Sequence, residues 1–86
     1  MNLIKVEYDY SDLKRKMNDC RYSQRLLAKK VSIGRSSLNL KLNNRGTFTQ
    51  TEIKRISDVL KIPVNEIGEY FFKVIVQKTV SSAKIN

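Results

Sequence analysis

Apolar residues recur along the middle of the chain with the spacing of two short helices. One stripe follows Ser23, a residue type that favours a helix N-cap, and a second stripe follows Gly34. Ile33 lies between the stripes, where an apolar turn residue would fill the space between the two helices. The pattern predicts a helix-turn-helix whose second helix covers about residues 34–42. The residues of the two stripes are Leu27, Ala28, Val31, Leu38 and Leu42.

Two small residues are expected to shape this helix pair. Ala28 is predicted at the helix crossing, where a short side chain lets the two backbones approach closely. Gly34 is predicted to supply the permissive backbone that the sharp bend needs. The turn is therefore expected to depend on the small side chain of Ala28 and on the backbone freedom of Gly34.

Alternating and helical patterns precede the helix pair. Residues 3–10 alternate between apolar and polar side chains, which predicts a short half-buried strand. Ser11 is expected to cap the next helix, whose apolar stripe runs from Leu13 through Met17 to Cys20. As the single cysteine, Cys20 cannot form an intramolecular disulfide, and we expect it to act as a small buried apolar residue.

Turn residues and a clear helix start follow the helix pair. Residues 43–47 are rich in turn formers. Thr49 and Glu52 have the spacing of a capping box, and Phe48 and Ile53 have the spacing of a hydrophobic staple around it. The sequence therefore predicts another helix from Thr49 onward, with its apolar stripe toward the core.

The C-terminal part combines a short helix with an apolar run. Pro63 is tolerated in a first helical turn and is expected to start a helix that ends at Gly68. Residues 70–76, YFFKVIV, have a strong β preference and predict a strand. Such a strand needs cover from the N-terminal strand, from a second subunit, or from both. We expect a mainly α, five-helix domain with short terminal β-strands over residues 1–80, and a flexible tail at 81–86.

The net charge of +9 is concentrated on the predicted helix-turn-helix. Residues 20–51 contain seven basic residues and no acidic residue, whereas the flanking parts of the chain mix both signs. A surface that binds a polyanion such as DNA requires this distribution, although a solvated basic face without a partner would share it. The seven residues are Arg21, Arg25, Lys29, Lys30, Arg35, Lys41 and Arg45.

The composition argues against catalysis and against a membrane location. The chain has no histidine, one cysteine and no glycine-rich phosphate loop. It therefore lacks a constellation for nucleophilic or metal-assisted chemistry, and we expect no enzyme, no catalytic residue, no metal and no cofactor. No apolar run approaches the roughly 20 residues of a membrane span, and the first ten residues lack the features of a signal peptide. We expect a cytoplasmic protein.

The helix pair resembles the helix-turn-helix of Cro/cI-type phage repressors over about residues 11–67. Residue types at the start of the first helix, the helix crossing, the turn and the second helix match the family. The departures lie in the turn and in the second helix. The family has glycine at the position of Ser32, a polar N-cap at the position of Gly34 and an apolar residue at the position of Lys41. The segments NLKLNN and EIGEYFF resemble small regulators from phages of Gram-positive bacteria, which implies a host bacterial cell. The matching residues are Gln24, Ala28, Ile33 and Leu38, and the departures are Ser32, Gly34 and Lys41.

A helical projection predicts which side chains of the second helix face DNA. With the buried stripe toward the core, Ser36 and Leu40 point outward, and Arg35, Asn39 and Asn43 flank them. Arginine pairs with guanine, asparagine with adenine, and serine with either. Leu40 either contacts a thymine methyl group or packs on the terminal segments. We predict base contacts from Arg35, Ser36, Asn39 and Leu40, and the resemblance implies the same role for Arg35, Ser36 and Leu40.

A second group of residues is predicted to bind the DNA backbone. Gln24 lies at a helix N-terminus, where its amide and the free backbone N–H groups can bind a phosphate, or it is an ordinary exposed polar residue. The loop after the second helix matches the family's other backbone contact, although its asparagines also suit a turn. The predicted phosphate contacts are Gln24, Asn43, Asn44, Arg45 and Thr47.

Together these features predict a sequence-specific transcriptional regulator that binds a double-stranded DNA operator. One helix-turn-helix reads only about half a turn of the groove, so we expect a homodimer on paired half-sites. The alternative is a modulator that binds a partner repressor protein and alters its operator binding. The resemblance to small phage regulators is compatible with both functions.

Overall fold

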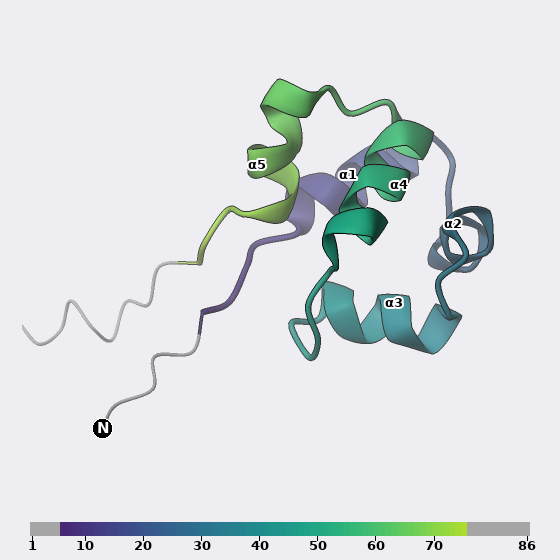
Figure 1. Ribbon diagram of the computed structural model, residues 1–86, viewed down its shortest axis with the longest axis horizontal. Coiled ribbons are helices and arrows are strands. Elements are labelled where there is room, and N and C mark those ends of the chain that lie inside the picture. The colour runs from purple at the N-terminus through teal and green to yellow at the C-terminus, as the bar shows by residue number, and fades with distance from the viewer. Residues whose placement is uncertain (1–5, 76–86) are drawn as a thin grey trace, which may run out of the picture.

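The computed structural model describes residues 6–75, which form a bundle of five α-helices and one short 3₁₀ helix (Figure 1). Helices α2 and α3 pack together as the helix-turn-helix, α4 packs against α2, and α5 packs against α1. The mainly α, five-helix class is therefore confirmed. The elements are α1 (Ser11–Asp19), α2 (Gln24–Val31), α3 (Arg35–Leu42), α4 (Gln50–Leu60), η1 (Val64–Glu66) and α5 (Ile67–Phe71).

One hydrophobic core joins all five helices. The apolar stripes expected on the helix pair are buried, and so is the turn residue Ile33. Aromatic rings close the core toward the chain ends, since Phe48 contacts both Tyr10 and Phe71 edge to face with ring centroids 5.5 Å apart. The buried apolar residues are Tyr10, Leu13, Met17, Leu27, Ala28, Val31, Ile33, Leu38, Leu42, Ile56, Leu60, Ile62 and Phe71.

Side-chain caps define two of the helix starts. The Ser23 hydroxyl accepts a hydrogen bond from the Leu26 N–H at the start of α2. Thr49 and Glu52 form the predicted capping box at the start of α4. The expected cap of α1 is wrong, because the Ser11 side chain does not cap that helix. Instead, the Asp9 carboxylate accepts from the Ser11 N–H at 2.9 Å, and hydrogen bonds from Ser11 lower the pKa of that carboxyl.

The turn between α2 and α3 bends at a different residue from the one predicted. Ser32 has the left-handed backbone, with φ 60° and ψ 43°, whereas Gly34 has an extended conformation with φ −60°. Gly34 is the N-cap of α3, and a Cβ built there would meet only the Cβ of Ser37 at 3.8 Å, an ordinary contact. The bend therefore does not need the glycine at position 34.

Replacement of Ser32 by glycine is expected to raise the free energy of unfolding by about 1 kcal/mol, because a left-handed backbone costs a residue with a Cβ about 1–2 kcal/mol. Ser32→Ala is the control, since alanine keeps the Cβ and should give no gain. Urea denaturation of both variants measures the difference. Equal stability of the two variants would show that the backbone at this position is not strained.

The predicted terminal strands are wrong for the described residues, which contain one isolated antiparallel bridge between Tyr8 and Val74 and no regular strand. Tyr70 and Phe71 belong to α5, and Phe71 is buried. Gly68, the predicted helix end, lies within α5. Burial of Phe71 in the core outweighs the local β preference of YFFKVIV. Residues 1–5 and 76–86, with the predicted tail, lie outside the described residues.

Candidate interaction surface of the helix-turn-helix

All four predicted base-contacting residues line one open groove between the start of α2 and the exposed face of α3. Arg35, Ser36, Asn39 and Leu40 all lie there, and Leu40 is 46% exposed. Three residues from the start of α2 complete the lining: Ser23, Gln24 and Arg25. The helical projection therefore placed the outward face of α3 correctly, while the contacts of that face with a partner stay a prediction.

Two amide side chains are hydrogen-bonded across this groove, and a third follows on the same helix. The Asn39 Nδ2 donates to Gln24 Oε1 at 3.0 Å, and the Asn43 Nδ2 donates to the backbone carbonyl of Asn39 at 2.9 Å. The sequence predicts phosphate binding for Gln24 and base reading for Asn39. In the structure the two side chains are hydrogen-bonded to each other across the groove.

Asn44 differs from the other predicted phosphate-binding residues, because its side chain clamps the N-terminal segment. Its Oδ1 accepts from the Tyr8 N–H at 2.8 Å, and its Nδ2 donates to the Tyr8 carbonyl at 2.9 Å. The backbone of Asn44 is left-handed, with φ 62°, as the predicted turn role allows. Arg45 and Thr47 are exposed in the same loop. The loop after α3 is thus tied to the chain's N-terminal segment.

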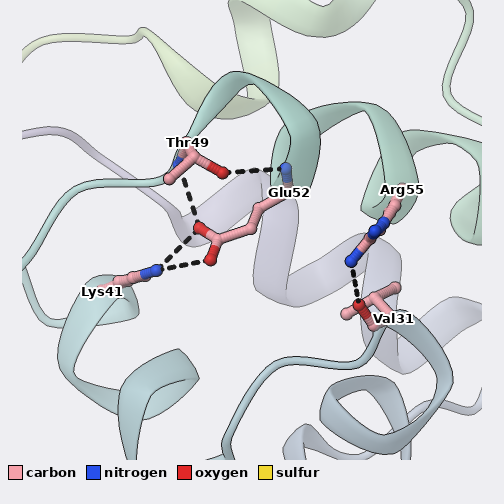
Figure 2. A network of polar contacts seen from close by, with 5 residues as sticks. All are labelled: Val31, Lys41, Thr49, Glu52 and Arg55. Carbon is pink, nitrogen blue, oxygen red and sulfur yellow. Dashed lines mark hydrogen bonds and ion pairs between the residues drawn. The ribbon is translucent and has the colours of Figure 1, made fainter.

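Lys41 forms an ion pair that sequence reasoning missed (Figure 2). Its ammonium lies 2.7 Å from both carboxylate oxygens of Glu52, and both side chains are largely buried. Because Glu52 also completes the capping box with Thr49, the pair fastens the end of α3 to the start of α4. The sequence contains one signal for this ion pair: a lysine stands beside a buried leucine, shortly before a loop that ends in a capping box. Lys41 is consequently not a free cation for phosphate.

The carboxyl of Glu52 has a pKa below its ordinary value of 4.5. Partial burial opposes ionisation, but hydrogen bonds from Lys41 and from the Thr49 N–H outweigh that effect. A folded-state pKa below the unfolded one stabilises the fold above pH 4.5, and this stabilisation is lost as the pH falls through the folded value.

The difference in unfolding free energy between the wild type and Glu52→Gln is therefore expected to shrink as the pH falls below 4.5. The glutamine side chain of this variant still accepts a hydrogen bond at the capping position, so the difference reports mainly on the ion pair. Denaturant titrations at several pH values measure it. A difference that is constant down to about pH 3 would contradict the role assigned to the charge.

A second contact from α4 supports the end of α2. The Arg55 guanidinium donates to the carbonyl of Val31, the last residue of α2, at 3.4 Å (Figure 2). A cation at a helix C-terminus satisfies a free carbonyl and favours the helix dipole. Helix α4 thus holds both helices of the pair, one through Arg55 and the other through Glu52.

Six of the seven basic residues in the acid-free segment have no ion-pair partner among the described residues. All six side chains are exposed, so the surface of the helix-turn-helix keeps a positive field after Lys41 is neutralised. They are Arg21, Arg25, Lys29, Lys30, Arg35 and Arg45.

Comparison with known proteins finds a family model and a similar solved structure. A family model described as a protein of unknown function, DUF739, matches residues 6–74, which include all five helices. The chain is also similar to the solution structure of the modulator of repression (MOR) of the temperate bacteriophage TP901-1 from Lactococcus lactis. The sequence identity is 32%, the TM-score is 0.66, and the similarity covers 76% of this chain and 88% of that one.

Two negative findings accompany this match. No curated protein matches the chain. Within residues 6–75, no helix is long and apolar enough to cross a membrane. The comparisons thus show the family and a similar phage protein, and the finer Cro/cI assignment stays a prediction.

Proposed function

The chain belongs to the DUF739 family, and from this membership and its similarity to the phage modulator of repression we propose that it modulates repression by binding a repressor protein. The observation that carries the proposal is the 32% identity to that modulator over 88% of its length. The chain alters operator binding by the repressor through protein contact. This is the alternative that the sequence left open.

The groove of the helix-turn-helix suits a protein partner. Leu40 is 46% exposed in the groove, which the cations Arg25 and Arg35 also line. An exposed aliphatic side chain near unpaired cations is complementary to a partner surface that combines apolar and acidic side chains. The partner surface on the repressor is therefore expected to be apolar at its centre and acidic at its rim.

The test uses the pure chain and the repressor from the same genome. Titration calorimetry should detect a complex, and a gel-shift assay should show that the chain alters the repressor's affinity for its operator. Leu40→Ala is expected to weaken the complex by at least about tenfold if the residue is a buried anchor. Val64→Ala is the matched control, because Val64 is 83% exposed and lies in η1. Absence of a complex would contradict this function, and equal effects of the two substitutions would contradict the groove as the contact surface.

Direct DNA binding is the second candidate, because six exposed cations on an acid-free helix-turn-helix favour a polyanion. In this function Arg35 reads a base and Arg45 contacts a phosphate. Selection of bound sites from random double-stranded DNA by the pure chain tests it. Arg35→Ala should then relax the preference at one base pair, and Arg45→Ala should weaken all sequences alike. If the selection enriches no sequence, the chain does not read DNA by itself.

A further inference from the structure

The two terminal segments of the described chain form a narrow ribbon with one closed edge and one open edge. Tyr8 and Val74 are bridged, and the bridge is held by two backbone bonds, from the Asp9 N–H to the Lys73 carbonyl at 2.7 Å and from the Ile75 N–H to the Glu7 carbonyl at 2.8 Å. In this pattern the N–H and C=O groups of Tyr8 point away from Val74, and those of Val74 point away from Tyr8. Both sets of groups therefore lie at the outer edges of the ribbon.

The edge on the N-terminal side is closed. The outward N–H and C=O of Tyr8 both bond to the side-chain amide of Asn44, at 2.8 and 2.9 Å. The edge on the C-terminal side is open, because within residues 6–75 no group accepts from the Val74 N–H or donates to its carbonyl. Figure 1 shows this segment at the margin of the molecule, beside the N-terminal segment and away from α2 and α3.

The ribbon also has an apolar face that is only partly covered, since Tyr8 packs against the core. Alternation along the two segments puts Val6, Tyr8 and Val74 on one side. Phe72, the C-cap of α5, joins this side through its ring, which is in edge-to-face contact with the ring of Tyr8 with centroids 6.3 Å apart. Val6, Phe72 and Val74 are each about half exposed. A two-stranded ribbon is marginal in water, and an open apolar edge is a template for another strand.

We propose that the open edge at Val74 pairs with the same edge of a second copy of this chain. Antiparallel pairing about a two-fold axis at Val74 lets each Val74 N–H donate to the other Val74 carbonyl, so the edge is complementary to itself. The result is a four-stranded sheet between two subunits, with their N-terminal segments at the outside under the Asn44 clamps. Phe72 and Val74 of both copies then form one continuous apolar face.

The charge of the pairing segment does not oppose the association of two copies of the chain. The charged residue next to Val74 in sequence is Lys73, and its ammonium lies 2.7 Å from the Asp12 carboxylate of its own chain. Lys73 is therefore neutralised within its own subunit. An apolar edge of this kind is suited to an identical edge, whereas the acid-free helix-turn-helix would repel its own copy.

The test measures the oligomeric state of the full chain and of two edge variants by analytical ultracentrifugation. Val74→Pro removes the outward N–H but keeps both internal bonds of the bridge, because those use Asp9 and Ile75 as donors. Val74→Lys places two like charges opposite each other across the two-fold axis. Val64→Lys is the matched control, since Val64 is also a solvent-exposed valine but belongs to η1.

The wild type and the Val64→Lys variant are expected to sediment as dimers of the 10.0 kDa chain. For Val74→Pro and Val74→Lys we expect the dissociation constant to rise by about ten- to a hundredfold, with unchanged helical circular dichroism. A monomeric wild type would overturn the proposal, and so would Val74 variants that dimerise like the wild type. The proposal would also be overturned if the wild type is monomeric alone but binds an added repressor through Val74. The open edge would then be a binding site for the repressor.

Discussion

Phe71→Ala is expected to lower the free energy of unfolding by about 3–5 kcal/mol, the usual cost of removing a buried aromatic side chain. Phe71 is 2% exposed and its ring packs edge to face against Phe48, which in turn contacts Tyr10. Removal of the ring leaves a cavity where α5 meets the rest of the core. The loss would be a large part of the roughly 5–15 kcal/mol that stabilises a typical small domain.

Phe72 provides the matched control, because it is the next residue and the same residue type but is 53% exposed. Phe72→Ala is expected to cost less than about 1 kcal/mol in the monomer. Guanidinium denaturation of both variants at a low protein concentration gives the comparison. Similar losses for the two variants would mean that α5 does not bury Phe71 in the core.

These two phenylalanines also show why the end of the chain was mispredicted. YFFKVIV has the composition of a strand, and a local interpretation of this segment depends on that composition. Ile67 and Phe71 are four residues apart, which is a helical spacing, but a single pair is too short to outweigh a seven-residue β pattern. The α5 contacts with α1 and the aromatic core decide the outcome, and no local pattern contains them.

The two helices of the helix-turn-helix were predicted well because their signals are local. Ser23 and the Thr49–Glu52 pair cap their helices as expected, and α3 runs over Arg35–Leu42 against a prediction of about 34–42. A cap, an apolar stripe and a short turn each involve residues within about four positions of one another. Such patterns can be recognised along the chain without knowledge of the fold.

Parts of the candidate site were missed, because they join residues that are distant in sequence. Asn44 bonds to the backbone of Tyr8 across 36 positions, and Lys41 pairs with Glu52 across 11. From the sequence, both Asn44 and Lys41 looked available to a ligand. In the fold each side chain stabilises the position of a neighbouring segment, and the free cations of the surface are correspondingly fewer.

If the chain binds DNA directly, its affinity is expected to fall by roughly 10³ to 10⁵ between about 50 and 200 mM salt, for a dimer that makes about six to ten phosphate contacts. The six unpaired cations of each helix-turn-helix supply these contacts. Each phosphate neutralised contributes about −0.9 to the slope of log affinity against log salt.

The ion pair between Lys41 and Glu52 sharpens this prediction, because an internally neutralised lysine releases no counterion from DNA. Arg45→Ala should reduce the magnitude of the salt slope by about one, whereas Lys41→Met should leave it unchanged. Fluorescence anisotropy with a duplex at several salt concentrations, under conditions where circular dichroism shows each variant folded, measures both slopes. Equal reductions would mean that Lys41 leaves Glu52 to bind phosphate. A nearly salt-independent affinity would contradict backbone-dominated DNA binding and would leave the acid-free surface to a protein partner.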